Sequence, residues 1–180
     1  MSFYLLAYHC SDCKTLIDAD DVEEPLVECA QMIRDADELY QHRRFAEAAS
    51  VFERIVKTYE KAKLIHASYV LIFGIYAPLV NCYRRTDQLP QSAAALRRLV
   101  KIMENNPAIA EHHPEKGDFY WNLGETFSKL VSRGGASPAV MARYRQEERE
   151  CYSRAAEIRT MCYGPKHFAT LEAKAALDKL

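Results

Sequence analysis

Apolar side chains recur at every third or fourth position along most of the chain, which is the spacing of one face of an α-helix. The first stripe starts soon after Val22 and consists of Leu26, Cys29, Ile33, Ala36 and Tyr40. Further stripes predict helices over about 45–63, 65–83, 90–105, 119–131, 138–161 and 168–180. Short turns between them favour antiparallel pairing. The expected fold is therefore all-α, a bundle of about seven helices.

Residues 1–21 do not follow this pattern. They show neither a helical period nor a strand pattern and end in an acidic cluster, in which Asp20 or Asp21 is a candidate helix cap. We expect an irregular N-terminal segment over 1–21 and a helical domain over 22–180. The loop expected before the fifth helix runs from Asn105 to Gly117.

The third predicted helix needs a separate explanation. Leu64–Tyr83 contains no Asp, Glu, Lys or Arg over twenty residues, which is long enough to span a bilayer. A helix that is apolar on all sides is equally suited to the centre of a soluble bundle. Ser68, Asn81 and the amphipathic neighbours favour the buried interpretation, so no membrane partner is expected. Pro78 should kink this helix.

The pattern repeats along the chain with a spacing of 44 residues. This spacing aligns three sets of positions: Met32, Tyr76 and Tyr120; Ala36, Val80 and Gly124; Leu39, Tyr83 and Phe127. A repeat of this length indicates stacked helix pairs, each packing on its neighbours. The alternative is a coincidental stripe in a generic helical bundle.

Tyr120, Leu123, Gly124 and Phe127 match the bulky, Leu-Gly and aromatic positions of a tetratricopeptide helix, and the chain resembles that class of repeat. The partner helix of the first repeat has aromatic, small and aromatic residues at Phe45, Ala48 and Phe52. Glycine within a helix costs about 1 kcal/mol relative to alanine. We therefore expect a neighbouring helix to approach closely at Gly124.

Composition narrows the function. The net charge is −1, which gives no electrostatic reason to expect nucleic acid as a partner. The N-terminus lacks a basic region followed by an apolar run, so we expect an intracellular protein, cytoplasmic or nuclear. The six cysteines are then expected to be reduced thiols without a disulfide framework.

Short motifs follow one another in the C-terminal half. His113-Pro114 precedes Leu123-Gly124, and a long predicted helix then ends in Ala155, Ile158, Tyr163-Gly164 and His167. In this order the chain resembles the C-terminal helical domain of the SET-MYND lysine methyltransferases, although Phe168 stands where that family usually has proline. Kinesin light chain repeats share part of the pattern.

The N-terminal cysteines favour the SET-MYND resemblance. Cys10 and Cys13 match the last two cysteines of the post-SET zinc motif, whereas Tyr8 stands at the first, and His9 is offset by one position. The SET core and the MYND module have no counterpart in the chain. The resemblance therefore implies a regulatory or substrate-gating C-terminal part of an S-adenosylmethionine-dependent protein-lysine methyltransferase, without catalytic activity of its own.

Few residues suggest chemistry within the chain itself. Cys10 and Cys13 have the spacing of half a zinc site, but no second pair completes the four ligands, so no cofactor is expected and zinc stays an alternative. His112 and His113 precede Pro114 in a predicted turn and are interpreted as turn residues. No catalytic residues are predicted.

The remaining functional surface is the concave face expected of stacked helix pairs, which is lined by the first helix of each pair. The positions expected there are Asp37, Tyr40, Asn81, Arg84, Trp121, Glu125 and Ser128. Trp121 is the only tryptophan and a candidate anchor. The alternative is that these are ordinary half-buried or solvated positions. The sequence predicts a module that binds a peptide or helix of another protein or domain.

Overall fold

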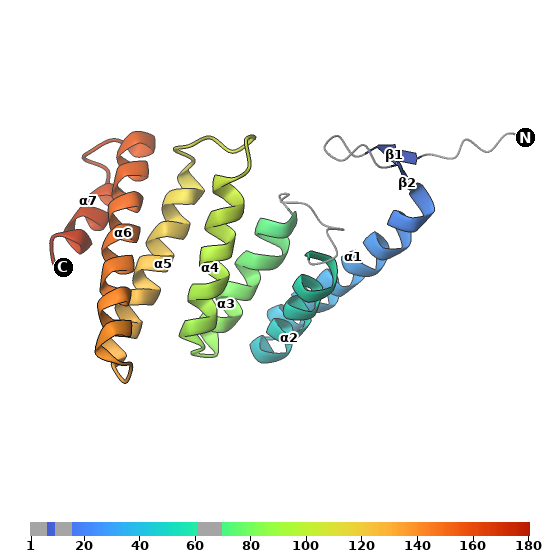
Figure 1. The fold of residues 1–180 in the computed structure, drawn as a ribbon, viewed down its shortest axis with the longest axis horizontal. Helices are drawn as coiled ribbons and strands as arrows, with labels where there is room; N and C mark the ends of the chain where they lie inside the picture. Colours follow the sequence, from blue (N-terminus) through green and yellow to red (C-terminus); the bar gives the residue numbers. More distant parts are fainter. Residues whose placement is uncertain (1–6, 10–15, 61–69) are drawn as a thin grey trace, which may run out of the picture.

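The computed structural model describes residues 7–9, 16–60 and 70–180. Within them the α-helices are α1 (Ala19–Gln41), α2 (Phe45–Ile55), α3 (Ala77–Arg85), α4 (Leu89–Glu104), α5 (Pro114–Arg133), α6 (Pro138–Tyr163) and α7 (Phe168–Leu177). They stand side by side in chain order, from α1 near the N-terminus to α7 at the C-terminus (Figure 1). The expected all-α architecture of antiparallel helix pairs is confirmed.

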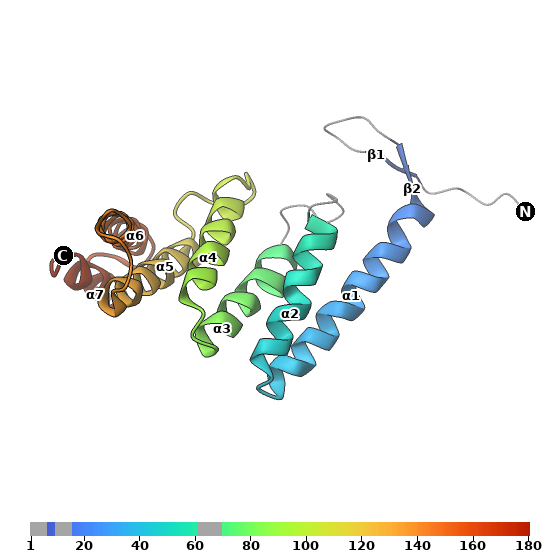
Figure 2. The ribbon, with the colours of Figure 1, turned by 60° about the horizontal axis from the view of Figure 1, so that its bottom comes forward.

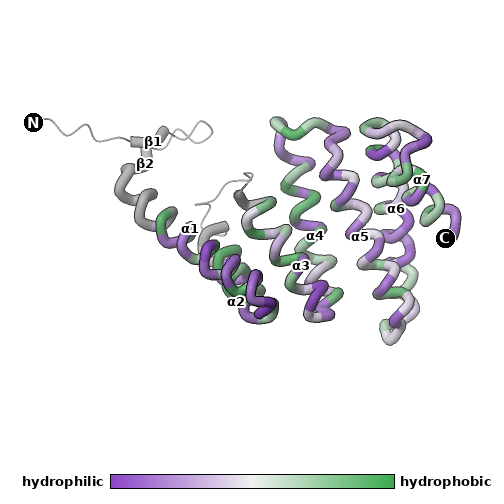
Figure 3. The backbone as a smooth tube through the Cα atoms, turned by 180° about the vertical axis from the view of Figure 1, so that it is seen from behind, coloured by the Kyte–Doolittle hydropathy of each residue, from purple (hydrophilic) through white to green (hydrophobic). Residues whose placement is uncertain are grey.

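Each helix packs mainly on the helices that precede and follow it in the chain. The pairs α1–α2, α3–α4 and α5–α6 are each joined by a short turn, and the row of pairs is seen again from a second direction in Figure 2. The α5–α6 pair has the most extensive contact. Hydrophilic and hydrophobic stretches alternate along α3–α6 (Figure 3), as expected for helices that are buried on one side.

The first turn shows why these connections are tight. Arg43 adopts a left-handed conformation with φ of 60°, and the amide of Arg44 donates to the carbonyl of Leu39. Asp87, in the α3–α4 turn, has φ of 62°. Pro90 lies in the first turn of α4, where the missing amide hydrogen leaves no hydrogen bond unmade.

The N-terminal segment is not wholly irregular. Strands β1 (Ala7–His9) and β2 (Leu16–Asp18) pair antiparallel, with Tyr8 opposite Ile17. Helix α1 then begins at Ala19, three residues earlier than expected, so Asp20 and Asp21 lie within its first turn rather than before it. Strands of three residues are too short to produce a recognisable alternation in sequence.

The apolar third helix is divided into two segments. A π-helical segment, η2 (Val70–Tyr76), leads directly into α3, and Pro78 lies in the first turn of α3. A second π-helical segment, η1 (Val56–Glu60), extends α2. The helix type thus changes from π to α directly before Pro78, which occupies one of the first positions of α3. Residues 64–69 of the apolar stretch lie outside the described residues.

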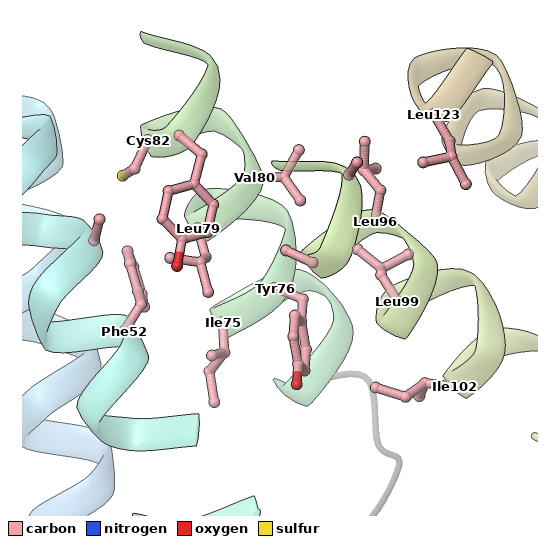
Figure 4. Packing of buried hydrophobic residues seen from close by; sticks show 14 of the residues in the cluster. Phe52, Ile75, Tyr76, Leu79, Val80, Cys82, Leu96, Leu99, Ile102 and Leu123 are labelled. Carbon is pink, nitrogen blue, oxygen red and sulfur yellow. The ribbon is translucent and has the colours of Figure 1, made fainter. Parts of the chain in front are cut away.

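The described part of the apolar stretch is buried within the protein. Ile75 is fully buried, and it packs with Leu79 and Cys82 in one core cluster that also includes Phe52 of α2 and Leu96 of α4 (Figure 4). Among the described residues, none of the helices is both long and apolar enough to cross a lipid bilayer. The buried interpretation of this segment is thus confirmed for most of its described side chains, whereas Asn81 is exposed; the buried ones are Ile75, Tyr76, Leu79, Val80, Cys82 and Tyr83.

The 44-residue spacing corresponds to equivalent places in the core. Ala36, Val80 and Gly124 are all buried, each on the first helix of its pair. Gly124 shows the tightest approach, because a Cβ atom added there would lie 2.8 Å from the Tyr152 ring of α6. A Cβ atom added at Gly117, nearer the start of α5, would lie 3.2 Å from Ile158 of α6. The prediction that Gly124 permits close helix packing is confirmed.

The boundary of α5 differs from expectation. The helix begins at Pro114, so residues 114–117 are helical and do not belong to the preceding loop. His113 is the N-cap, and its Nδ1 accepts a hydrogen bond from the amide of Glu115 at 3.3 Å. The interpretation of His113 as a structural turn residue is confirmed. The predicted loop included residues 114–117 because proline and glycine favour turns. Proline and an acidic residue also suit the first turn of a helix, and that is where Pro114 and Glu115 lie.

Candidate functional site

The first helices of the three pairs present a row of equivalent polar residues. Asp37 of α1, Asn81 of α3 and Glu125 of α5 each directly follow one of the three buried small positions, so they project in the same direction relative to the core. Asp37 and Asn81 are exposed, and Glu125 is half-buried. Tyr40, Arg84 and Ser128 follow one turn later and are all half-buried. We call these six residues the first-helix surface.

A polar cluster joins α3 to α5 on this surface. The Arg84 guanidinium donates to Asn122 Oδ1 at 2.7 Å and to Glu125 Oε2 at 3.1 Å. Both members of the ion pair are about one-third exposed, since their side chains retain 28% and 34% of their accessible area. The sequence placed Arg84 and Glu125 on one face, and the structure brings them into contact.

Asn122 was not among the predicted surface residues. Its side chain also donates to the carbonyl of Asp118, which fixes the amide so that its oxygen faces Arg84. Asn122 is one residue from Trp121 and three from Glu125. The sequence could have indicated Asn122 through its i, i+3 spacing to Glu125, because residues three apart are neighbours on a helix surface.

At the other predicted positions, local packing within a helix pair dominates. The Tyr40 ring meets Phe45 edge-on, with centroids 5.3 Å apart, across the α1–α2 turn. Partial burial raises the pKa of the Asp37 carboxyl above its usual range. Among the seven predicted positions, Asp37 and Asn81 are the exposed ones.

Trp121 of α5 packs against side chains of α6. Its ring centroid is 5.1 Å from that of Tyr152, and the Arg159 guanidinium lies 4.8 Å from the Trp121 ring. Arg159 is buried and also binds Asp118 at 2.9 Å and the carbonyl of Ala169 at 3.1 Å. The half-buried indole is therefore part of the packing of α5 on α6, which limits how much of it a partner could contact.

A separate cavity of about 430 Å³ lies between α2, α3 and α4. Its wall is largely apolar, and the Tyr83 hydroxyl donates to Glu53 at 2.6 Å within it. Burial, followed by that hydrogen bond, raises the pKa of Tyr83, so the phenol stays protonated and a donor. The lining residues are Glu53, Val56, Lys57, Tyr76, Leu79, Tyr83, Gln91, Ala94, Ala95 and Arg98.

The structure offers no metal centre in the part of the chain that it describes: no group of three or more His, Cys, Asp or Glu residues could hold an ion. Cys10 and Cys13, the candidate zinc ligands, lie outside the described residues. Cys29, Cys82 and Cys151 are buried free thiols, and Cys162 is half-buried. Burial raises the pKa of Cys82 to about 11 and that of Cys151 to about 12, so neither is a reactive thiolate at neutral pH.

Comparison with known proteins shows what class of fold this is. Neither the models of protein families nor the curated proteins gave a match. A crystal structure of a Podosopora anserina protein, described as a putative kinesin light chain with nearly identical TPR-like repeats, superposes with a TM-score of 0.56 at 16% identity. The match covers 84% of this chain and 64% of that one, so the chain spans less than two thirds of the similar structure.

A second crystal structure, of a variant of the same protein, gives a TM-score of 0.44 at 15% identity over 84% of each chain, which is too low to add support. With the helix pairs and the buried 44-residue positions, the TM-score of 0.56 assigns this chain to the TPR-like helical-repeat folds. At 16% identity the similarity concerns the fold alone.

Proposed function

We propose that this chain is a protein-interaction module that binds an extended peptide or a helix of another protein or domain on its first-helix surface, without catalysing a reaction. The observation that supports it best is the row formed by Asp37, Asn81 and Glu125, three hydrogen-bonding side chains at one equivalent position of successive repeats. Stacked repeats commonly use such an extended surface for binding.

The chemistry of this surface fits a peptide backbone. Carboxylate and amide oxygens accept hydrogen bonds from backbone amides, and the Asn81 amide can also donate to carbonyls. Arg84 is held by Asn122 and Glu125, so a ligand would meet a neutralised cation in a fixed position. Side-chain ordering before binding lowers the entropic cost of association.

Peptide selection by phage display against the purified protein tests this proposal. Affinities of selected peptides are then measured for Asn81→Lys and Asp37→Lys, with Ser50→Lys on the exposed side of α2 as the matched control. We expect each surface variant to weaken binding by about tenfold or more, equivalent to about 1.4 kcal/mol, with the control unchanged. Peptides that bind all three variants alike would exclude this surface.

A second candidate is the C-terminal part of a SET-MYND methyltransferase, packed over a SET domain and shaping access to its lysine channel. The ordered motifs support it, but each also has a structural role within the repeat: His113 and His167 cap α5 and α7, and Gly164 ends α6 with φ of 89°. Leu123 is buried. The motifs therefore indicate the helical repeat more directly than they indicate a methyltransferase.

Metal analysis and S-adenosylmethionine binding on one purified sample distinguish the two candidates. About one zinc per chain, lost in Cys10→Ser and Cys13→Ser, would support the post-SET interpretation. Absence of zinc and of cofactor binding in a helical protein is the expected result for the interaction module.

An intracellular location, cytoplasmic or nuclear, is part of the proposal, and fractionation of cells expressing the protein tests it.

A further inference from the structure

The cavity beside Tyr83 has a counterpart one repeat later in the chain. The 44-residue spacing pairs Tyr83 with Phe127, and it pairs α2 with α4, which begin at Phe45 and Leu89. The groove between α2 and α4, which contains the cavity, is therefore equivalent to the groove between α4 and α6. We call them the α2–α4 groove and the α4–α6 groove. The second one shows which side chains can occupy such a space.

Side chains of the protein fill the α4–α6 groove. The Arg97 guanidinium lies 4.9 Å from the centre of the Phe127 ring and donates to a carboxylate oxygen of Glu147 at 2.8 Å. The Tyr144 ring packs on the same phenylalanine, with centroids 5.7 Å apart. Phe127 is fully buried as a result. The α4–α6 groove therefore holds a cation paired with a carboxylate, and beside it an aromatic ring.

Different side chains line the α2–α4 groove. Glu53 stands at the position equivalent to Arg97, so a carboxylate takes the place of a cation. Tyr144 belongs to the first two turns of α6, which is ten residues longer than α4, with 26 residues against 16. The wall that α4 contributes has two small side chains, Ala94 and Ala95, at its centre. The resulting cavity of about 430 Å³ lies within the range of about 300–1,000 Å³ that is typical of small-molecule sites.

The two ends of this cavity differ in charge. At one end the Tyr83 hydroxyl donates to a carboxylate oxygen of Glu53 at 2.6 Å. Glu53 is exposed, and a carboxylate can accept several hydrogen bonds, so it has capacity for a further donor. Lys57 lies one turn further along α2, and Arg98 lies one turn beyond Ala94 on α4, which runs in the same direction. The cavity therefore favours a cation at the Glu53 end and disfavours one at the other end.

We propose that the α2–α4 groove binds a small aromatic amine, with the ammonium group on Glu53 and the ring between Leu79 and Ala95. This ligand combines the two groups that fill the equivalent groove, a cation beside a carboxylate and an aromatic ring. The contact of ammonium with carboxylate is a charge-assisted hydrogen bond, and the largely apolar wall buries the ring. The basic end of the cavity excludes a second ammonium group, so the ligand is a monoamine.

Three probes with the same ring test the charge requirement. Phenethylamine, phenethyl alcohol and hydrocinnamate are each titrated into the isotope-labelled full chain, and NMR chemical shifts report both affinity and location. We expect the amine to bind at least about tenfold more tightly than the alcohol and to shift resonances of α2, α3 and α4. The carboxylate should bind no more tightly than the alcohol. Equal binding of amine and alcohol, or a preference for the carboxylate, would overturn the proposal.

Variants of the protein locate the ammonium group and the ring. Glu53→Gln keeps an acceptor for the Tyr83 hydroxyl and removes the charge, so binding of phenethylamine should weaken by about tenfold or more. Glu150→Gln, at an exposed position of α6, is the matched control and should leave binding unchanged. Ala94→Phe, at an exposed position of the cavity wall, should abolish binding because its ring occupies the space. Binding that survives both Glu53→Gln and Ala94→Phe would exclude this groove.

The source of the amine is tested with a short peptide that has phenylalanine at its N-terminus and so carries the same ring and ammonium group. If this peptide binds at least about tenfold more tightly than phenethylamine, the ligand is a protein terminus and the small-molecule class is wrong. Absence of binding by all three probes would also overturn the proposal. Asn81→Lys on the first-helix surface should leave phenethylamine binding unchanged, so this inference and the proposed function can fail separately.

Discussion

Gly124 of α5 lies against the ring of Tyr152 on α6 so closely that a Cβ atom at position 124 would be 2.8 Å from both Cδ1 and Cε1 of the tyrosine. Tyr152 is itself buried and lies beside Trp121. An aromatic ring held on two sides cannot yield easily, so the contact fixes how near the two helices of the third pair approach.

Gly124→Ala should therefore destabilise the protein even though alanine is the better helix former. The gain in helix propensity is about 1 kcal/mol, whereas forcing an extra methyl group into a packed interface costs typically about 1–3 kcal/mol. We expect a net loss of up to about 2 kcal/mol in urea unfolding. Gly117→Ala is the matched control, with its nearest contact at 3.2 Å, and should lose less. A stabilised Gly124→Ala protein would contradict the close packing.

The Arg84–Glu125 pair should show a measurable coupling energy across α3 and α5. A double-mutant cycle with Arg84→Met and Glu125→Gln isolates it, and we expect about 0.5–1 kcal/mol, because both side chains are partly screened by solvent. The exposed pair between Arg44, the N-cap of α2, and Glu47 of α2 is the control and should show a weaker coupling. The coupling should decrease in about 1 M salt, where the Debye length is about 3 Å. A zero coupling energy at low salt would remove this contact as a link between repeats.

Arg159→Met should loosen α7 from the rest of the protein. The substitution removes the hydrogen bonds to Asp118 and to the Ala169 carbonyl and the contact with Trp121, at a cost of about 1–3 kcal/mol. The emission of Trp121, the only tryptophan, should change in the native state, and hydrogen exchange of α7 should accelerate. Arg145→Met, at an exposed position of α6, is the control. Unchanged exchange in α7 would show that its buried small residues suffice to hold it.

Stability should fall in alkaline solution because of the buried thiols. Burial raises the pKa of Cys82 from 9.0 to about 11 and that of Cys151 to about 12. Above about pH 9 the unfolded chain releases these protons while the folded chain retains them, so the free energy of unfolding decreases as pH rises. Each thiol contributes up to about 1.4 kcal/mol per pH unit between the two pKa values.

Urea unfolding in steps from about pH 8 to about pH 10.5 measures this slope. Cys151→Ala should reduce the slope, whatever its effect on stability near neutral pH. Tyr152, whose pKa burial raises from 10.0 to about 12, adds to the decline only in the upper part of this range. A Cys151→Ala protein with an unchanged alkaline slope would show that folding does not raise the pKa of this thiol.

Much of the fold could be predicted because helix formation and amphipathic stripes are local properties. The 44-residue spacing located three equivalent core positions, and Gly124 was recognised from its cost within a helix. The surface prediction was less complete. Trp121 and Asn122 are adjacent in sequence, and which one turns toward α6 and which toward Arg84 depends on a rotation of about 100° about the helix axis.

By itself the sequence determined the helices of this protein, their pairing order and the register of the repeat, since these follow from short-range spacing and turn residues. The tertiary structure alone decided the Arg84–Glu125 contact, the position of Trp121 between Tyr152 and Arg159, and the cavity between α2, α3 and α4. Those features depend on the rotation and separation of neighbouring helices, which result from the packing of many side chains and leave no periodic signal in the chain.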